Sequence, residues 1–444
     1  MGGKLGAVLL ALTLAVAGPA RAADDPLSLY RAAREANAGF AAAEAAYRAD
    51  REAGAQGRAL LLPKVRLHGQ VLELRQSEPM AFGGMSLRPE GTSASYGIAL
   101  TQTLYNAADF AAADQARDAG ELAELRLRAA EIGLLLDLTR HYFALLQAQD
   151  GVRLLREQRA AAEHALADAA ERYRLGEATI TDRYEAQARL DAIAAASLAA
   201  EQELSIAREQ LARVAGRPVE AVLPLQAEPI LPPLHPTGID EWLTRTEGGD
   251  PRLRILRTAL AIAAREPDKH RALAAPVVEL VAEYGRDPML EFLDLAGIRN
   301  DGHTASIGVR LSVPLYTGGA RSSQYRQAVA GAEQARRELL EATRRTAVET
   351  RAAFLGVETG LARVRALERN LASAASRLES TQTGKSVGAR TTLDVLDAQQ
   401  DYYRVRRELL SARYRYLLSM LELRALSGEL GERHLAELGD VLAR

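Results

Sequence analysis

The sequence of 444 residues contains no cysteine, which excludes disulfide bonds and a lipid-modified cysteine. Aromatic residues are scarce as well: they make up 5% of the chain, although 48% of it is hydrophobic and alanine is abundant. Small side chains in such excess favour long, closely packed helices over a thick mixed core. With a formal net charge of −2 and no dense basic run, the chain gives no indication of a nucleic-acid partner.

Long hydrophobic runs are also missing, because no stretch has 18 consecutive apolar residues. Residues 1–22 have the pattern of a secretory signal peptide. Lys4 gives the positive start, residues 7–17 the apolar run, and residues 20–22 an A-x-A cleavage site. We therefore expect the mature protein to leave the cytoplasm and, if it enters a membrane, to do so as a β-barrel.

Proline is absent from residues 107–215 and from everything after Pro314. Apolar positions recur at helical spacing through both tracts, and each is interrupted by one short turn that contains glycine. The spacing predicts four long helices, over residues 107–173, 182–215, 320–382 and 392–427. The first would be roughly 100 Å long, which is typical of a coiled coil or a helical tube.

Four shorter stretches alternate between apolar and polar residues, as strands with one apolar face do. They cover residues 65–75, 94–105, 277–285 and 304–316. The first two are joined by a long polar loop, residues 76–93, and the last two by another, residues 287–303. A helix is predicted before each pair, over residues 26–62 and 250–273, with a kink or break in the second at Pro267.

The order of these elements repeats along the chain. Residues 97–105 match residues 308–316 at an offset of 211, and residues 175–187 match residues 387–399 at an offset of 212. A near-constant offset predicts an internal duplication. We divide the mature chain into a first repeat, a proline-rich linker, a second repeat and a C-terminal segment, at residues 23–216, 217–249, 250–428 and 429–444.

The repeat gives each chain four strands, which are too few to close a barrel that admits anything. An open sheet with edges exposed to lipid is not stable in a bilayer. Either several copies therefore pool their strands, in which case a trimer would supply twelve, or the strands do not lie in a membrane.

An acidic stretch follows the second turn. Residues 386–391 form a turn, and Thr391 or Thr392 is the expected N-cap of the helix that follows. The carboxylates of Asp394, Asp397 and Asp401 recur at spacings that place them on one helix face. Capping by the first acid and a solvated acidic face are sufficient to explain this pattern.

Three stretches resemble sequences of the TolC family of outer-membrane channel proteins: residues 172–182, 311–319 and 386–397. The resemblance extends over essentially the whole mature chain. It implies an α+β membrane protein that forms a homotrimer. A twelve-stranded β-barrel in the outer membrane of a Gram-negative cell, four strands per protomer, would continue into the periplasm as a long α-helical barrel.

The resemblance also implies a function and partners. Such channels conduct exported proteins or small molecules, and packed helical hairpins close their periplasmic end. They act with an inner-membrane ABC or other efflux transporter and with a periplasmic adaptor, while outer-membrane lipid surrounds the barrel. The missing lipidation cysteine favours the secretion branch over the lipidated efflux channels, although the transporter selects the cargo.

Carried over by the resemblance, Asp394 and Asp397 match two aspartates that ring the pore constriction of the family. Six carboxylates around one axis would attract cations and, by mutual repulsion, favour partial protonation. Asp401 matches no such aspartate and would extend the acidic face by one turn.

The resemblance assigns Thr181, Asp182 and Arg390 to links between neighbouring hairpins in the closed state. Lys385 stands where the family archetype has a tyrosine. A lysine there either forms an ion pair with Asp182, which would contribute at most about 1 kcal/mol, or leaves the link absent.

The two turns are the expected tips of the helical hairpins, where adaptors of this family dock. The tip residues are Leu175, Gly176, Val387 and Gly388. Glycine permits the left-handed backbone of a tight reversal. The same glycines would also serve as ordinary turn residues that contact no partner.

Signs of other functions are missing from the sequence. The seven histidines form no pairs at helical spacing, so we expect no metal site. No P-loop or nucleophile elbow occurs, so we expect neither a cofactor nor an enzyme. The alternative to a channel is a periplasmic coiled-coil adaptor or scaffold that does not span the outer membrane, although the duplicated strand pairs are unlike an adaptor.

Overall fold

The computed structural model describes residues 23–75, 80–82, 85–87, 90–273, 275–286 and 303–442. The predicted signal peptide lies outside these residues, and so do nearly all of the predicted loop over residues 287–303 and the last two residues of the C-terminal segment. The chain forms two compact units. One combines the N-terminal part as far as Ala41 with residues 131–243 and 349–444, and the other combines residues 42–130 with residues 244–348. Each unit therefore draws on both halves of the chain.

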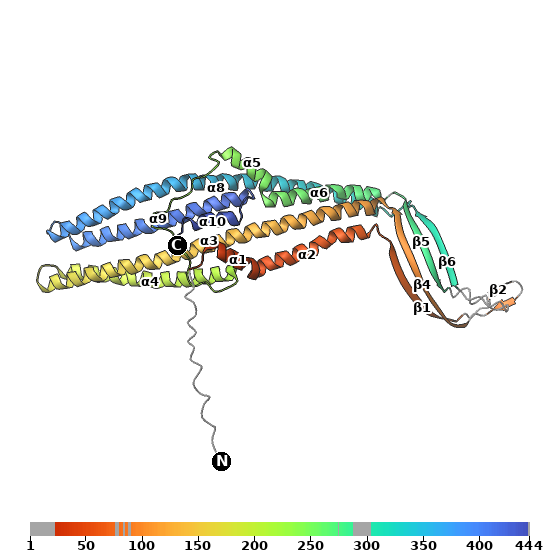
Figure 1. The fold of residues 1–444 in the computed structure, drawn as a ribbon, viewed down its shortest axis with the longest axis horizontal. Helices are drawn as coiled ribbons and strands as arrows, with labels where there is room; N and C mark the ends of the chain where they lie inside the picture. Colours follow the sequence, from red (N-terminus) through yellow and green to blue (C-terminus); the bar gives the residue numbers. More distant parts are fainter. Residues whose placement is uncertain are drawn as a thin grey trace, which may run out of the picture. The chain divides into compact units, whose positions relative to one another are not determined.

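The second unit contains an antiparallel sheet with the strand order β1-β4-β5-β6 (Figure 1). Its strands are β1 (Lys64–Arg75), β4 (Glu90–Tyr105), β5 (Val277–Arg286) and β6 (His303–Ser312). The central pairing of β4 with β5 joins the two halves of the chain. A small hairpin of β2 (Met80–Phe82) and β3 (Met85–Leu87) lies within the segment predicted as a loop.

The register places the apolar residues of all four strands on one face. Leu67 lies opposite Ile98, which lies opposite Tyr284. Ala282 lies opposite Ile307, whose side chain is 77% exposed. The other face is polar, and it carries the pairs His68–Glu283 at 3.4 Å and Glu279–Arg310 at 3.6 Å. A sheet with an exposed apolar face is incomplete as a water-soluble structure.

Two strand predictions differ from the structure. β4 begins at Glu90, within the predicted loop, because it pairs with the full length of β1 as far as Arg75. The strand predicted over residues 304–316 ends at Ser312. Pro314 has no N–H group to donate to a ladder, so the alternation of apolar residues outlasts the strand.

The helices of the second unit include α2 (Ala38–Ala59) and α6 (Pro251–Ala272), together with the adjoining parts of α3 (Ala107–Arg174) and α8 (Ala320–Ser386). Helix α6 continues through Pro267 as one helix, so the alternative of a break there was wrong. Helices α2 and α3 pack so closely at Gly57 that no larger residue fits there. A Cβ atom at this position would lie only 2.4 Å from the Cβ of Ala116.

The first unit holds two helical hairpins, one of α3 with α4 (Ile180–Ala215) and one of α8 with α9 (Thr392–Leu426) (Figure 1). Its smaller helices are α1 (Pro26–Ala36), α10 (Glu432–Gly439) and the start of α5 (Ile239–Gly249), which lies within the predicted linker. Segment 217–238 packs on the hairpins through buried tyrosines. Tyr142 donates to the carbonyl of Leu223 at 2.9 Å, and Tyr416 donates to that of Pro232 at 2.5 Å.

The single helix predicted over residues 26–62 is two helices, and Asn37 separates them. The Asn37 side chain donates to the carbonyl of Val214 at 2.9 Å and accepts from the backbone N–H of Phe40 at 2.9 Å. An asparagine with these partners ends one helix and caps the next, which helical periodicity alone does not reveal.

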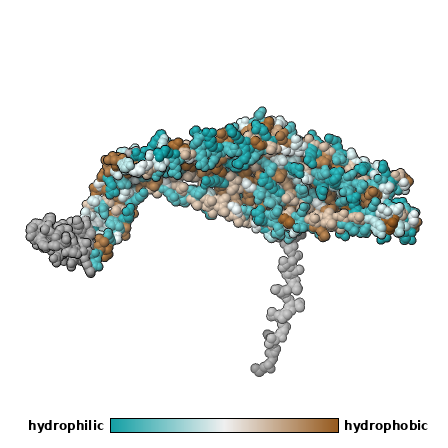
Figure 2. Space-filling view, turned by 180° about the vertical axis from the view of Figure 1, so that it is seen from behind, coloured by the Kyte–Doolittle hydropathy of each residue, from teal (hydrophilic) through white to brown (hydrophobic). Residues whose placement is uncertain are grey.

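Polar and apolar side chains are mixed over the exposed helices (Figure 2). Among the described residues, no helix combines the length and the apolar character that crossing a membrane requires.

Candidate functional site at the hairpin tips

The two hairpin tips have the same backbone structure, and both belong to the first unit. Gly176 and Gly388 have φ angles of 77° and 76°, in the left-handed region. At the first tip, the N–H of Glu177 donates to the carbonyl of Arg172 at 2.8 Å. At the second, the N–H of Ala389 donates to that of Gly384 at 2.8 Å. In each bond the donor lies five positions after the acceptor and directly follows the glycine. This is the 6→1 hydrogen bond of the Schellman motif, which ends a helix.

Each tip is followed by a reciprocal cap. The Oδ2 of Asp394 accepts from the backbone N–H of Thr391 at 2.9 Å, and the Thr391 hydroxyl accepts from the N–H of Asp394 at 3.1 Å. Thr179 and Asp182 make the same pair of bonds at 2.8 and 3.2 Å. Thr391 is therefore the N-cap of α9, and Asp182, predicted to link hairpins, caps α4 within its own turn.

The caps hold both carboxylates in the ionised form. The backbone bond from Thr391, followed by the bond from its hydroxyl, lowers the pKa of Asp394 below the ordinary value. Thr179 lowers the pKa of Asp182 in the same way. The caps therefore act at neutral pH and weaken only as the pH falls through these lowered values. In Asp394 this effect opposes the partial protonation that a carboxylate ring favours.

The other two predicted pore aspartates have arginine partners within the chain. Asp397 lies 2.9 Å from Arg189 of α4, so this contact joins the two hairpins. Asp401 lies 2.7 Å from Arg377 of α8 and 3.3 Å from Arg404 of α9. The three acids lie on one helix as predicted, but they do not have equivalent surroundings.

Lys385 forms an ion pair, but not with the expected partner. Its Nζ lies 2.6 Å from the Oδ2 of Asp168 on α3, and its side chain is only 16% exposed. Within the described residues Lys385 forms no ion pair with Asp182. Its charge still contributes, after the bonds from Thr179 and the charge of Arg172, to lowering the pKa of that carboxylate. The lysine links the α8–α9 hairpin to the α3–α4 hairpin through an acid that the sequence comparison did not single out.

A small apolar cluster underlies these contacts. Ala169 of α3, Ala186 of α4 and Leu396 of α9 are buried against one another. Alanine lets the helices approach closely enough for the Lys385–Asp168 and Arg189–Asp397 pairs to form. Near the tips, the contact between the two hairpins therefore combines close packing with the Lys385–Asp168 and Arg189–Asp397 ion pairs.

The remaining predicted residues face outward. Leu175 is 55% exposed and Val387 is 74% exposed, so both tips present an apolar side chain. Thr181 and Arg390 are exposed. The backbone N–H of Arg390 donates to the carbonyl of Gly384 at 3.2 Å, and its side chain lies directly beside that glycine.

Sequence reasoning missed Thr179, Asp168 and Arg189. The first was detectable, because a threonine three residues before an aspartate at the start of a helix signals a capping box. The other two lie in mid-helix among many charged residues, and only the packing of one hairpin on the other identifies them. Within the described residues there is no cluster of three or more side chains suited to bind a metal ion.

Comparison with known proteins identifies the family. The sequence model for outer membrane efflux proteins matches residues 29–217 and, separately, residues 242–429. The chain belongs to the outer membrane efflux protein family. The resemblance to TolC proteins inferred from the sequence is thereby confirmed.

Relatives within the outer membrane efflux protein family align over nearly the full chain. Outer membrane protein TolC of Vibrio cholerae is 28% identical over 94% of this chain and 93% of its own length. Proteases secretion protein PrtF of Dickeya chrysanthemi is 30% identical over 97% of this chain and 94% of its own. The crystal structure of the Campylobacter jejuni CmeC outer membrane channel aligns with a TM-score of 0.80 at 15% identity, covering 94% of this chain and 89% of that one. The fold is therefore that of these channels.

Proposed function

We propose that this protein is an outer-membrane exit duct. It conducts exported proteins or small molecules from an inner-membrane transporter and a periplasmic adaptor to the cell exterior. Membership of the outer membrane efflux protein family supports the general role. Relatives named for TolC and for protease secretion support a duct that serves an export system.

The observation that carries the proposal is the four-stranded sheet. Its apolar face is exposed, and among the described residues β1 and β6 each pair with one strand only. Lipid is a suitable solvent for such a face, but an unpaired strand edge in lipid leaves backbone groups without hydrogen bonds. Three copies that join β6 of one to β1 of the next give a closed barrel of twelve strands with no free edge.

Aromatic residues at both ends of the apolar face favour a membrane setting. At one end the ring of His303 lies 6.4 Å from that of Tyr96 and 6.0 Å from that of Tyr284. At the other, Tyr105 lies 6.4 Å from Phe110, and a bulge in β4 sets Tyr105 opposite Val278 on the apolar face.

The spacing of the two aromatic groups suits a bilayer. Ten residues of β4, from Tyr96 to Tyr105, cover about 30 Å at about 3.3 Å per residue. A strand tilt of about 40° reduces this length to a height of about 23 Å, close to the roughly 25 Å apolar band of outer-membrane barrels.

The helical hairpins form the periplasmic part of the duct, a tube of twelve helices in the trimer. Two separate matches to one family model, together with two tips of the same structure, support the internal duplication. The exposed Leu175 and Val387, one at each tip, are suited to bind apolar side chains of an adaptor. Gly176 and Gly388, the next residue in each case, form the turns that present them.

The gate lies at the same tips. Three copies of α9 bring Asp394, Asp397 and Asp401 together at the narrowest point, where their charge favours cations. In the closed state Lys385 and Arg189 hold the two hairpins of one chain together through Asp168 and Asp397. Opening separates these pairs. Thr181 and Arg390, exposed in the single chain, remain available to a neighbouring copy.

The assembly is tested by fractionating cells that express the full chain. We expect it in the outer-membrane fraction, migrating as a trimer in an unheated detergent gel and as a monomer after boiling. Recovery as a soluble periplasmic protein would contradict the proposal and favour an adaptor or scaffold. The family assignment favours the channel over that alternative.

A further inference from the structure

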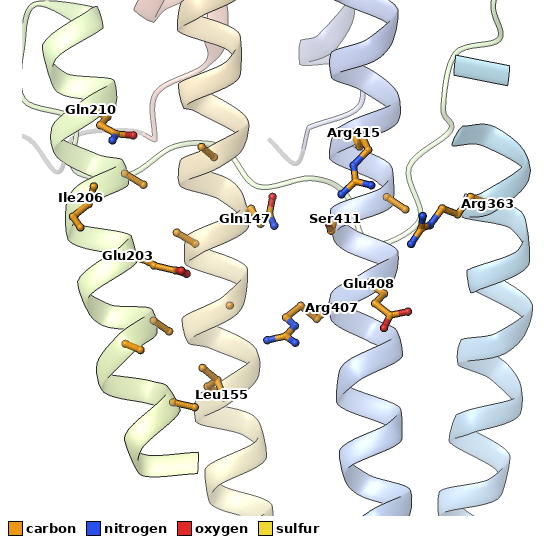
Figure 3. A pocket seen from close by; sticks show the side chains of 18 residues that line it. Gln147, Leu155, Glu203, Ile206, Gln210, Arg363, Arg407, Glu408, Ser411 and Arg415 are labelled. Atoms are coloured by element: carbon orange, nitrogen blue, oxygen red, sulfur yellow. The ribbon is translucent and has the colours of Figure 1, made fainter. Parts of the chain in front are cut away.

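A groove of about 760 Å³ lies among α3, α4, α8 and α9 in the first unit (Figure 3). It exists because the helices that form its floor present small side chains, so nothing fills the space between them. The small lining residues include Ala144, Ala148 and Gly151 of α3, Ala196 and Ala200 of α4, and Ala412 of α9.

Two arginines of α9 that line the groove lack the carboxylate partners that the other arginines of this helix have. Helix α9 has six arginines. Four of them have a carboxylate partner: Arg404, Arg406, Arg413 and Arg424. Arg407 and Arg415 form no ion pair with the described residues, and both line the groove. Arg363 of α8 also lines it without an acidic partner in the described part of the chain.

The acids of the groove do not neutralise these arginines. Glu408 is held 3.1 Å from Arg404. Glu203 lies on the opposite wall, on α4, and makes no ion pair among the described residues. Arg407 reaches from α9 toward α3 in Figure 3. The groove therefore carries an excess of positive charge that the described residues leave uncompensated.

The groove lies on the side of the hairpins away from segment 217–238. Arg413 donates to the carbonyl of Ala227 in that segment, and Arg415, two positions later, is rotated by about 200° around the helix. Helix α3 shows the same relation between positions two residues apart. Tyr142 donates a hydrogen bond to the carbonyl of Leu223 in the segment, whereas Ala144 lines the groove. If segment 217–238 wraps the outside of the tube, the groove faces its interior.

We propose that this groove binds acidic segments of a polypeptide in transit. The inference rests on the proposed duct and names a chemical class of cargo. Arg407 and Arg415 are two helical turns apart, about 12 Å along α9. Carboxylates four residues apart on an extended chain are about 13 Å apart, so one such pair matches both guanidinium groups. Hydrogen bonds between guanidinium groups and carboxylates are charge-assisted. A concave site lined by charges of one sign also focuses their electric field more than an open surface does.

The test uses the full chain in detergent and a fluorescently labelled hexa-aspartate peptide, with binding followed by fluorescence anisotropy. We expect binding that weakens as salt is raised. The double variant R407Q/R415Q is expected to weaken it at least tenfold. The control variant R365Q/R369Q removes the same charge from exposed positions of α8 outside the groove, and it should change the affinity less than twofold.

Three outcomes would overturn the inference: unchanged affinity in R407Q/R415Q, equal loss in both double variants, or equal binding of a labelled hexa-lysine peptide. The assay needs no conducting pore, so it separates this inference from the proposed function. A protein that binds the acidic peptide but forms no outer-membrane trimer would retain the groove and refute the duct.

Discussion

At the scale of single residues, three aspartates on one face of α9 have three different roles. Asp394 closes the cap with Thr391, Asp397 pairs with Arg189, and Asp401 pairs with Arg377. Only Asp397 bonds directly to the other hairpin. A uniform acidic ring is therefore a simplification, and substitutions at the three positions should have separable effects.

The capping threonines provide the first prediction. T391A removes the acceptor for the N–H of Asp394, and T179A does the same at α4. Each is expected to cost about 1 kcal/mol of local stability. Hydrogen exchange of the first-turn amides measures the loss. T181A, which changes an exposed threonine next to one cap, should leave protection unchanged; equal loss there would contradict the assignment of the cap.

The second prediction concerns ion selectivity. D397N removes a carboxylate that we propose lines the constriction and leaves the cap intact, so the preference of the proposed trimer for cations should fall. R189Q frees the charge of Asp397 and should raise that preference. Reversal potentials across a planar bilayer under a salt gradient measure both changes. Shifts in the same direction, or none, would show that Asp397 does not face the conducted ions.

At the scale of elements, the sequence predicts most helices and strands because their signals are local. Alternation locates the strands, and the missing prolines locate the long helices. The elements that it misplaces depend on distant partners. Asn37 separates two helices by bonding to Val214, β4 is prolonged by pairing with β1, and Lys385 finds Asp168 only when two hairpins pack.

Helix α10 gives a third prediction, which concerns pH. His434 accepts from the N–H of Gly431 at 3.1 Å, and burial, with the nearby charge of Arg424, lowers its pKa to about 4. The unfolded chain binds a proton near pH 6.5, so stability is lost as the pH falls from 6.5 toward 4. Thermal unfolding across this range should show a flatter pH dependence in H434Q. An unaltered slope would contradict the assignment.

At the scale of the whole molecule, the proposed duct requires that the two faces of the sheet meet different solvents. Family membership and fold indicate a channel protein, whereas closure of the proposed barrel requires copies that a single chain does not contain. Sequence alternation predicted the apolar face. It could not reveal which edges remain unpaired, since that depends on the order β1-β4-β5-β6.

The fourth prediction uses the absence of cysteine, which makes any introduced cysteine the only one. I307C lies on the apolar face, and S306C, its neighbour, lies on the polar face. In isolated outer membranes a membrane-impermeant maleimide should label S306C and not I307C, and both should react after denaturation. Equal labelling before denaturation would mean that both faces of the sheet meet water.

The proposed duct requires three copies that enclose a conducting path. The most direct measurement is the current through a planar lipid bilayer after addition of the purified, unheated protein. A trimeric duct should give discrete, uniform conductance steps that the boiled protein does not produce. A trimer that inserts into the bilayer yet never conducts, even with both tip ion pairs removed by K385Q and R189Q, would contradict this proposal.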